Sequence, residues 1–278
     1  NPGESAAQLL GDGMTIYFQM GGDPGGAATL PRTNGARDAA KAFGVKLVEQ
    51  YSGWQQETMI KQMKEAMAAN PDGIAIMGHP GEGAFERLVK EARSRGIVVT
   101  TGNTPLPGLQ SSYGADGFGY AGVVLYEGGK ITAQEMINKG GLKKGDKVLV
   151  YGLLSQGPRG ESTRGMKDTL EAAGMEVDYL EISNEVNRDF TLCAPIITAH
   201  IAKSPDLKAI GTQHGGITAT LPRVLKNSGK KPGDIIIGGI DLAPATITGL
   251  EEGYITAALD QQLYLQGFLP VVQIILSK

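Results

Sequence analysis

The sequence predicts an α/β protein of two similar lobes, each a parallel sheet wound on both sides by helices. Short runs of β-branched residues alternate with amphipathic segments along the chain, which is the pattern of βαβ units. About ten such runs occur, too many strands for one ordinary open sheet. The 41 glycines and an aromatic content of only 6% suggest many tight strand-to-helix turns. Two doubly wound lobes therefore explain the pattern best.

The first half of the chain is predicted to form four strands separated by three helices. Stop signals follow the helices at Gly44, Asn70–Gly73 and Arg95–Gly96. The second helix has its methionines on one face, so we expect them in the core. The predicted strands are Met14–Phe18, Val45–Val48, Ile74–Met77 and Ile97–Thr101. The predicted helices are Asn34–Phe43, Glu57–Ala69 and Gly83–Ser94.

The second half repeats this alternation, and Ser111–Gly114 is at best a short strand before it. Gly174 ends one of its helices. The predicted strands are Lys147–Tyr151, Val177–Leu180, Leu207–Thr212, Ile235–Ile240 and Ile255–Leu259. The predicted helices are Tyr120–Asn138, Ser162–Ala173, Phe190–Lys203, Ile217–Asn227, Ala243–Glu252 and Gln262–Ser277.

Charge and composition argue against several classes of function. With 26 basic and 29 acidic residues, the chain has no excess of positive charge for nucleic acid or anionic lipid. The single Cys193 excludes an internal disulfide and a Cys-rich zinc site, and it is expected in the core. The three histidines lack metal-ligand spacing, so no metal or cofactor is predicted. No apolar run is long enough to span a membrane.

One motif suggests a nucleotide and is interpreted otherwise. Gly117–Gly122 has the form G-x-G-x-x-G and is predicted to open a helix. A dinucleotide site needs it directly after a long buried strand, with an acidic residue about 20 positions later, and neither is evident. Glycines that permit a tight crossover between the lobes are the better interpretation. The chain also lacks a phosphate-binding loop and a G-x-S-x-G nucleophile motif, so no machinery for covalent catalysis is predicted.

Polar side chains instead follow seven predicted strands, just past their carboxyl ends, where open α/β sheets bind small ligands. These residues are Asp23, His79, Asn103, Arg159, His214, Asp241 and Gln261. Each alone could be a helix cap or a turn residue. Together they offer the acceptors and donors that bind the hydroxyls of a sugar or polyol. Phe190 either covers the apolar face of such a ligand or belongs to the core.

An ordered series of short motifs resembles the type I periplasmic substrate-binding proteins, in the ribose-binding group that serves sugar ABC transporters. The resemblance runs from about Met14 to Lys278, and its first motif is similar to the family's G-A-x-x-A-A-x-x-x-G. The motifs are Asn34–Gly44, Asn70–Ile76, Gly96–Thr104, Arg164–Met166, Ser204–Ile210, Gly239–Asp241 and Asp260–Gly267.

The resemblance implies roles for individual residues. Asp241 matches the aspartate that accepts from sugar hydroxyls, and Gln261 matches the glutamine at the lobe boundary. Phe190 matches the aromatic that covers the ligand. Asn103 and His214 stand at pocket positions where ribose binders have other residues. Arg159 lies near a pocket position of the family, with an offset of one residue. Asp116 falls at the first crossover, on the edge of the expected cleft.

Two departures from the family bear on specificity and on the end of the chain. Ribose binders have paired aromatics in the first loop, and Gly21–Thr29 has none. A hexose, a polyol or a modified sugar is therefore expected as readily as an aldopentose. Family members usually continue past the helix that ends near Lys278 and cross between the lobes a third time.

The implied architecture is two lobes joined by a hinge, with the ligand in the cleft between them. One lobe would comprise residues 1–115 and 262–278, and the other residues 116–261. The implied function is a non-enzymatic carrier that delivers a monosaccharide or polyol to the membrane permease of an ABC transporter. We expect a monomer in the periplasm or outside the cell, free or lipid-anchored, with its signal segment missing from this chain.

Three other functions stay open at this point. A ligand sensor for a chemoreceptor or kinase would have the same sequence features. A transcription regulator would need a helix-turn-helix, which the thirteen residues before Met14 are too few to form. A nicotinamide-dependent enzyme depends only on Gly117–Gly122.

Overall fold

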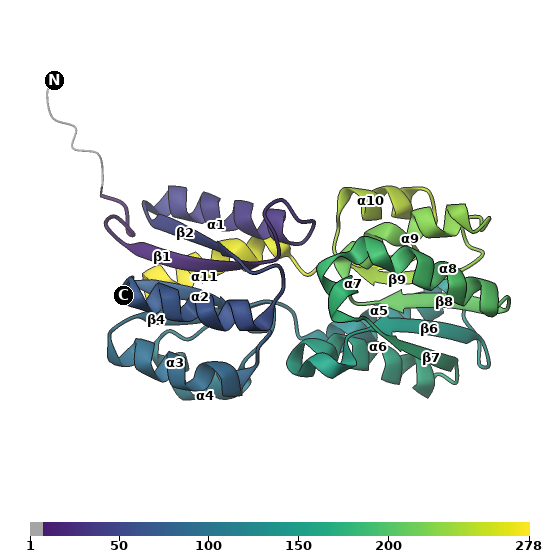
Figure 1. Cartoon of the computed structure of the whole chain (residues 1–278), viewed down its shortest axis with the longest axis horizontal. Coiled ribbons are helices and arrows are strands. Elements are labelled where there is room, and N and C mark those ends of the chain that lie inside the picture. Colours follow the sequence, from purple (N-terminus) through teal and green to yellow (C-terminus); the bar gives the residue numbers. More distant parts are fainter. Residues whose placement is uncertain (1–7) are drawn as a thin grey trace, which may run out of the picture. The chain divides into compact units, whose positions relative to one another are not determined.

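The computed structural model describes residues 8–278, which divide into two compact units (Figure 1). Unit 1 comprises the described residues up to Gly122 together with Gln262–Lys278, and unit 2 comprises Val123–Gln261. The expected start of the first lobe, residues 1–7, lies outside the described residues. Unit 1 extends past Ala115 because the short strand Tyr120–Ala121 joins its sheet.

Unit 1 is built on a sheet of five parallel strands in the order β2-β1-β3-β4-β5. Its central strands β3 and β4 are buried along their whole length, because helices cover both faces of the sheet. The strands are β1 (Thr15–Gly21), β2 (Lys46–Tyr51), β3 (Gly73–Met77), β4 (Val98–Gly102) and β5 (Tyr120–Ala121).

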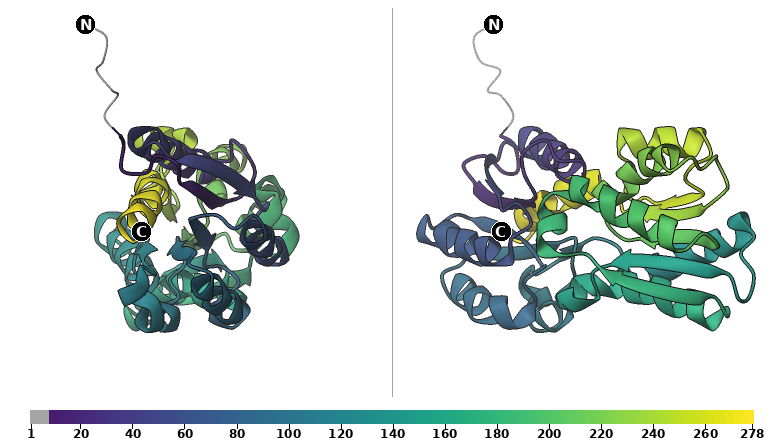
Figure 2. Two further views of the ribbon diagram at one scale, coloured as in Figure 1. Left: turned by 90° about the vertical axis from the view of Figure 1, so that its left-hand side faces the viewer. Right: turned by 45° about the vertical axis from the view of Figure 1, so that its right-hand side comes forward.

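Two helix layers enclose this sheet. Helices α1 (Thr29–Phe43) and α11 (Leu263–Leu276) lie side by side on one face, although they come from opposite ends of the chain (Figures 1 and 2). Helices α2 (Gln56–Ala68) and α3 (Glu82–Ser94) cover the other face, where the methionines of α2 are buried as expected. Two short helices complete the unit: α4 (Pro107–Tyr113) and the 3-10 turn η1 (Gly114–Asp116).

Unit 2 repeats the topology of unit 1. Its parallel order is β10-β9-β8-β6-β7, so the first strand of each unit lies between the second and the third. The strands are β6 (Lys147–Gly152), β7 (Glu176–Glu181), β8 (Leu207–Thr212), β9 (Ile236–Ile240) and β10 (Ala257–Leu259). Two such sheets confirm the predicted α/β class. Across residues 8–278, no helix has the length and apolar character needed to cross a membrane.

The second sheet is also covered on both faces. Helices α5 and α6 pack on one face and α8 and α9 on the other, and α10 packs beside α9. The helices are α5 (Leu125–Gly140), α6 (Glu161–Ala172), α7 (Asn184–Arg188), α8 (Cys193–Lys203), α9 (Gly215–Asn227) and α10 (Pro244–Glu251). The 3-10 turns are η2 (Leu154–Gly160) and η3 (Phe190–Leu192).

Two predictions around the first crossover are wrong. Ser111–Gly114 is not a strand, because Pro107 opens helix α4 at its first position and the helix runs to Tyr113. Tyr120 does not open a helix, since it pairs with Thr101 as part of β5, and α5 begins only at Leu125. The segment Gly117–Gly122 therefore contains the short strand β5 and does not open a helix. A dinucleotide fingerprint needs the reverse order, strand then helix.

Glycine pairs set the close approach of two helix pairs. A Cβ added to Gly35 would overlap the carbonyl of Tyr264, and one added to Gly267 would overlap the carbonyl of Arg32. Helices α5 and α6 repeat this arrangement at Gly129 and Gly165. Since the obstructing atoms are backbone, no side-chain rotation can relieve the overlap. Each unit thus holds one helix pair together through contacts that only glycine permits.

We expect Gly267→Ala to lower the free energy of unfolding by about 1–3 kcal/mol, because the added methyl group pushes α11 away from α1. Urea unfolding of the whole chain measures the change. Gly83→Ala is the matched control, since Gly83 lies in α3 with no atom near the added methyl group. That control should stay within about 1 kcal/mol of the native chain. Equal stability of the two variants would contradict the packing argument.

Candidate functional site

The carboxyl-terminal edge of each sheet gathers most of the polar residues predicted from the sequence. All strands within a sheet are parallel, so the loops that follow them begin at the same edge. The strand order places a topological switch point between β1 and β3 in unit 1 and between β6 and β8 in unit 2. We call the loops at this edge the rim of the unit.

The rim of unit 1 joins His79 to Asn103. His79 follows β3, is 2% exposed and donates from Nε2 to Asn103 Oδ1 over 2.8 Å. Asn103 follows β4 with φ of 64°, a left-handed conformation that Asn adopts more readily than most residues. Its Nδ2 donates to Gln266 Oε1 at 3.1 Å, so its Oδ1 is the acceptor for His79. The two predicted residues are therefore part of one buried network.

The same network contains residues that the sequence analysis missed. Arg32 of α1 is 1% exposed and donates from Nη1 to the Met20 carbonyl (2.9 Å) and from Nη2 to Gln266 Oε1 (3.1 Å). Predicting the helix to start at Asn34 rather than Thr29 left Arg32 in a loop. Gln266 comes from α11, far along the chain, and no local pattern indicates its position.

The other two candidates in unit 1 lie outside this network. Asp23 is exposed in the loop after β1, and its carbonyl accepts from Gly26 N–H at 3.1 Å. Asp116 lies in η1, before β5, and therefore at the amino-terminal edge of the sheet. There it forms an ion pair with Arg93 at 3.3 Å. Asp116 therefore lies away from the rim of unit 1.

In the rim of unit 2, Asp241 pairs with Gln261. Asp241 follows β9, is 4% exposed and has φ of 69°. Its N–H donates to the Leu259 carbonyl at 2.9 Å, which attaches it to the end of β10. Its Oδ1 accepts from Gln261 Nε2 at 2.7 Å. The carboxylate is thus held in one orientation by two neighbouring strand ends.

Arg159 brings a positive charge to the same rim. It lies in η2, after β6, and its Nη1 donates to Gln156 Oε1 and to Asn187 Oδ1, both at 2.9 Å. Burial lowers the pKa of Arg159 to about 10, although the Asp241 carboxylate acts in the opposite direction. The guanidinium therefore stays charged at neutral pH. Sequence analysis missed Asn187, since it lies in the short helix α7 that was not predicted.

His214 and Phe190 complete the rim of unit 2. His214 is the N-cap of α9, and its Nδ1 accepts from Ile217 N–H at 3.4 Å. Burial, with the positive charge of Arg159 as a second cause, lowers the pKa of His214 to about 3. The ring is therefore neutral at physiological pH, with its hydrogen on Nε2. Phe190 lies in η3, and its ring packs so closely on Gly216 that a Cβ there would overlap it.

The chemistry that the side chains of the two rims offer is hydrogen bonding. Burial raises the pKa of the Cys193 thiol to about 11, so this buried residue is unreactive, as expected for the core. Within the described range, no group of three or more His, Cys, Asp or Glu side chains could hold a metal ion. The rims offer a carboxylate, guanidiniums, carboxamides and imidazoles, held by the hydrogen bonds described above.

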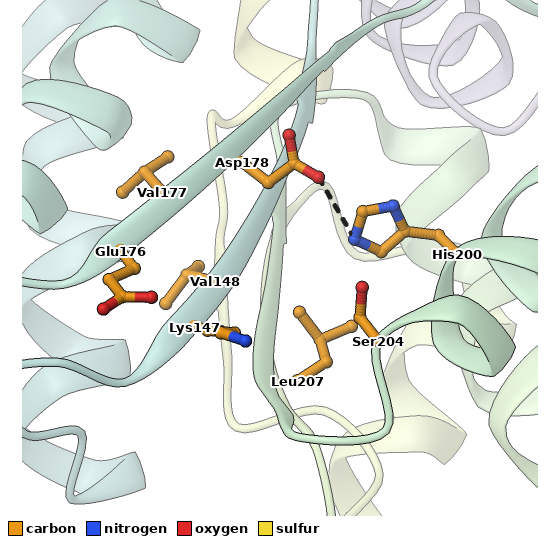
Figure 3. A pocket seen from close by; sticks show the side chains of 8 residues that line it. All are labelled: Lys147, Val148, Glu176, Val177, Asp178, His200, Ser204 and Leu207. Carbon is orange, nitrogen blue, oxygen red and sulfur yellow. Dashed lines mark ion pairs between the residues drawn. The ribbon is translucent and has the colours of Figure 1, made fainter.

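A separate pocket of about 390 Å³ opens at the amino-terminal edge of the second sheet (Figure 3). In it Asp178 faces His200, with Oδ2 3.6 Å from Nε2. The lining residues are Lys147, Val148, Glu176, Val177, Asp178, His200, Ser204 and Leu207. None of the predicted site residues is among them, so this pocket is distinct from the rim.

Comparison with known proteins gives a family match and two curated relatives. Residues 31–275 match the model of the periplasmic binding protein domain. The chain is 29% identical over 229 residues to a xylose/arabinose-binding protein of Sulfolobus acidocaldarius, covering 79% of this chain but only 55% of that protein. It is 23% identical over 234 residues to a D-ribose/D-allose-binding protein of Pseudomonas aeruginosa, covering 81% and 71%. This chain thus spans about half the length of the first relative.

Solved structures share the fold. A solute-binding protein of an ABC transporter from Burkholderia graminis, in complex with D-arabinose, superposes with a TM-score of 0.78 at 23% identity and covers 95% of this chain and 88% of that one. A carbohydrate transporter from Acidothermus cellulolyticus, in complex with myo-inositol, gives 0.77 at 20% identity and covers 94% and 85%. At these identities the similarity is one of fold.

We expect acid to destabilise the chain through His214. Because its folded pKa is depressed, only the unfolded chain gains a proton there as the pH falls from about 6.5 towards 3. The stabilisation present above pH 6.5 is therefore lost on acidification, by about 2 kcal/mol between pH 7.5 and pH 5. Urea unfolding at both pH values should show this loss reduced by that amount in His214→Asn.

The control for this experiment is His200→Asn, which removes the histidine that lies outside both rims. If His214→Asn and the native chain lost the same free energy of unfolding between the two pH values, this result would contradict a buried neutral imidazole at His214.

Proposed function

This chain belongs to the periplasmic binding protein domain family, and from that premise we propose that it binds a monosaccharide or polyol without converting it chemically. The observation that carries the proposal is the pair of rims at the switch points of two identically ordered sheets. Each rim fixes buried donors and acceptors by hydrogen bonds within its own unit. The proposal assigns one ligand to both rims, with hinge motion near Gly122 and Gln262 bringing them onto it.

The side chains of the rims suit neutral hydroxyl groups. Asp241 accepts, Arg159 donates, and the carboxamides of Asn103 and Gln261 can do both. Phe190 supplies an apolar surface for the C–H groups of a sugar. A ligand without a matching hydroxyl would leave a buried group unpaired, at a cost of about 1–3 kcal/mol. Specificity would arise from that cost.

Delivery to the membrane permease of an ABC transporter, outside the cytoplasm and by a monomer, is the finer part of the proposal. This part is supported by the proteins to which the chain is similar. Among the similar solved structures are a solute-binding protein of an ABC transporter in complex with D-arabinose and a carbohydrate transporter in complex with myo-inositol. The curated relatives are named for binding xylose, arabinose, ribose and allose.

We expect a thermal-shift screen to identify the ligand class. The panel contains pentoses, hexoses, deoxysugars and polyols at millimolar concentration, including the sugars named for the relatives. A ligand at roughly 1,000 times its dissociation constant adds about 4 kcal/mol of stability, which raises the melting temperature visibly. One hit, or a few hits related in stereochemistry, would support the proposal. No response across the panel would count against sugar binding.

We expect Asp241→Asn to abolish the stabilisation by the identified sugar and to leave the unliganded fold intact. Asn keeps the size of the side chain and tolerates the left-handed backbone at this position, so the loss would report the missing carboxylate acceptor. Asp116→Asn is the matched control, because Asp116 pairs with Arg93 at the other edge of its sheet. Undiminished binding by Asp241→Asn would remove Asp241 from the site.

A further inference from the structure

Trp54, the only tryptophan in the chain, lies in the turn that follows β2, at the rim of unit 1. Its φ is 62°, a left-handed conformation that is a genuine outlier for so bulky a residue. The turn is attached to the end of β1, since the N–H groups of Trp54 and Ser52 both donate to the Gly21 carbonyl, at 3.2 and 3.1 Å. Strained backbone of this kind concentrates at functional sites.

The end of β1 is shaped to receive the indole. A Cβ added to Gly21 or to Gly22 would overlap the Trp54 ring, so these two glycines leave the space that the ring occupies. The first loop lacks aromatic residues of its own. The aromatic side chain at this point of the rim is instead Trp54, which comes from the turn after β2 and is partly exposed.

Two polar members of the rim lie against the indole. The His79 imidazole stacks on it with ring centroids 5.6 Å apart and planes at 26°. The Arg32 guanidinium carbon is 5.9 Å from the ring centroid, within the range of a cation–π contact. Trp54 is therefore continuous with the buried network that links His79, Asn103, Gln266 and Arg32.

We propose that Trp54 is a ligand-contacting residue, and that it selects a cyclic sugar or cyclitol over an open-chain polyol. Cyclic sugars expose a patch of C–H groups that fits an aromatic face, beside hydroxyls that reach neighbouring polar groups. An open chain offers no such patch in a single conformation. This inference rests on the proposed sugar-binding function and adds the aromatic element of unit 1 to it.

A tryptophan ring that only filled space would need neither the left-handed backbone at Trp54 nor the space left by Gly21 and Gly22. The core beside it contains several flexible methionines, which fill gaps without backbone strain. The left-handed backbone keeps a rigid aromatic ring at the edge of the sheet instead.

The native chain itself provides the first test, because all tryptophan fluorescence comes from Trp54. A sugar that raises the melting temperature should also shift the emission and reduce quenching by acrylamide at least twofold. Cyclic sugars or cyclitols should act at lower concentration than the corresponding alditols. Stabilisation by a sugar with emission and quenching unchanged would overturn the role of Trp54 and leave sugar binding standing. No stabilisation by any sugar would overturn both.

Two variants provide the second test. Trp54→Ala should raise the dissociation constant of the identified sugar about tenfold or more, whereas Trp54→Phe should stay within about threefold of the native chain. Tyr254→Ala is the matched control, since Tyr254 also has a cation over its ring, Lys226 at 5.1 Å, but lies before β10, at the other edge of its sheet. It should leave the dissociation constant unchanged.

Native affinity in a folded Trp54→Ala chain would overturn the proposal. If Trp54→Ala does not fold, the fluorescence of the native chain and the affinity of Trp54→Phe decide it. A preference for alditols over cyclic sugars in the native chain would also overturn it.

Discussion

Parallel pairing of the strands is the constraint on which the rest of this structure depends. Neighbouring strands run in the same direction, so each sheet sends all of its strand ends, and the loops that follow them, to one edge. Helices cover both faces, so apolar side chains dominate the inward positions of the strands and most of the polar site residues lie in the loops. The rims are a consequence of this geometry, and unit 2 reproduces it with the same strand order.

Buried polar groups need partners, and each rim supplies several of them within its own unit. The Arg32, Gln266, Asn103 and His79 side chains form one connected chain of hydrogen bonds, and Asp241 with Gln261 forms another. Such networks fix the direction in which each donor and acceptor points. The low pKa of His214 adds a ring that stays neutral over the physiological range of pH.

The fold class and much of the rims could be predicted from the sequence, because both follow from where strands end. Asp241, His79 and Asn103 were found by their place after a buried apolar run. The strand β5 was missed because two residues are too few to show alternation. The position of Asp116 before that strand, at the amino-terminal edge of the sheet, was therefore not foreseen. Arg32 and Gln266 were missed because their helices bring them to the rim through tertiary packing, whereas Trp54 had a local signal, an aromatic just past a strand.

The return of the chain to its first sheet has a consequence for biosynthesis. Helix α11 covers one face of the sheet in unit 1 and contacts α1 at the glycine pair Gly35 and Gly267, yet it is translated after all of unit 2. A nascent chain that has emerged only as far as Gly122 would leave apolar side chains such as Ile16, Ala36 and Ala39 without their cover. Unit 2 is continuous and can condense first, while unit 1 must wait as an incomplete intermediate of the kind that chaperones bind.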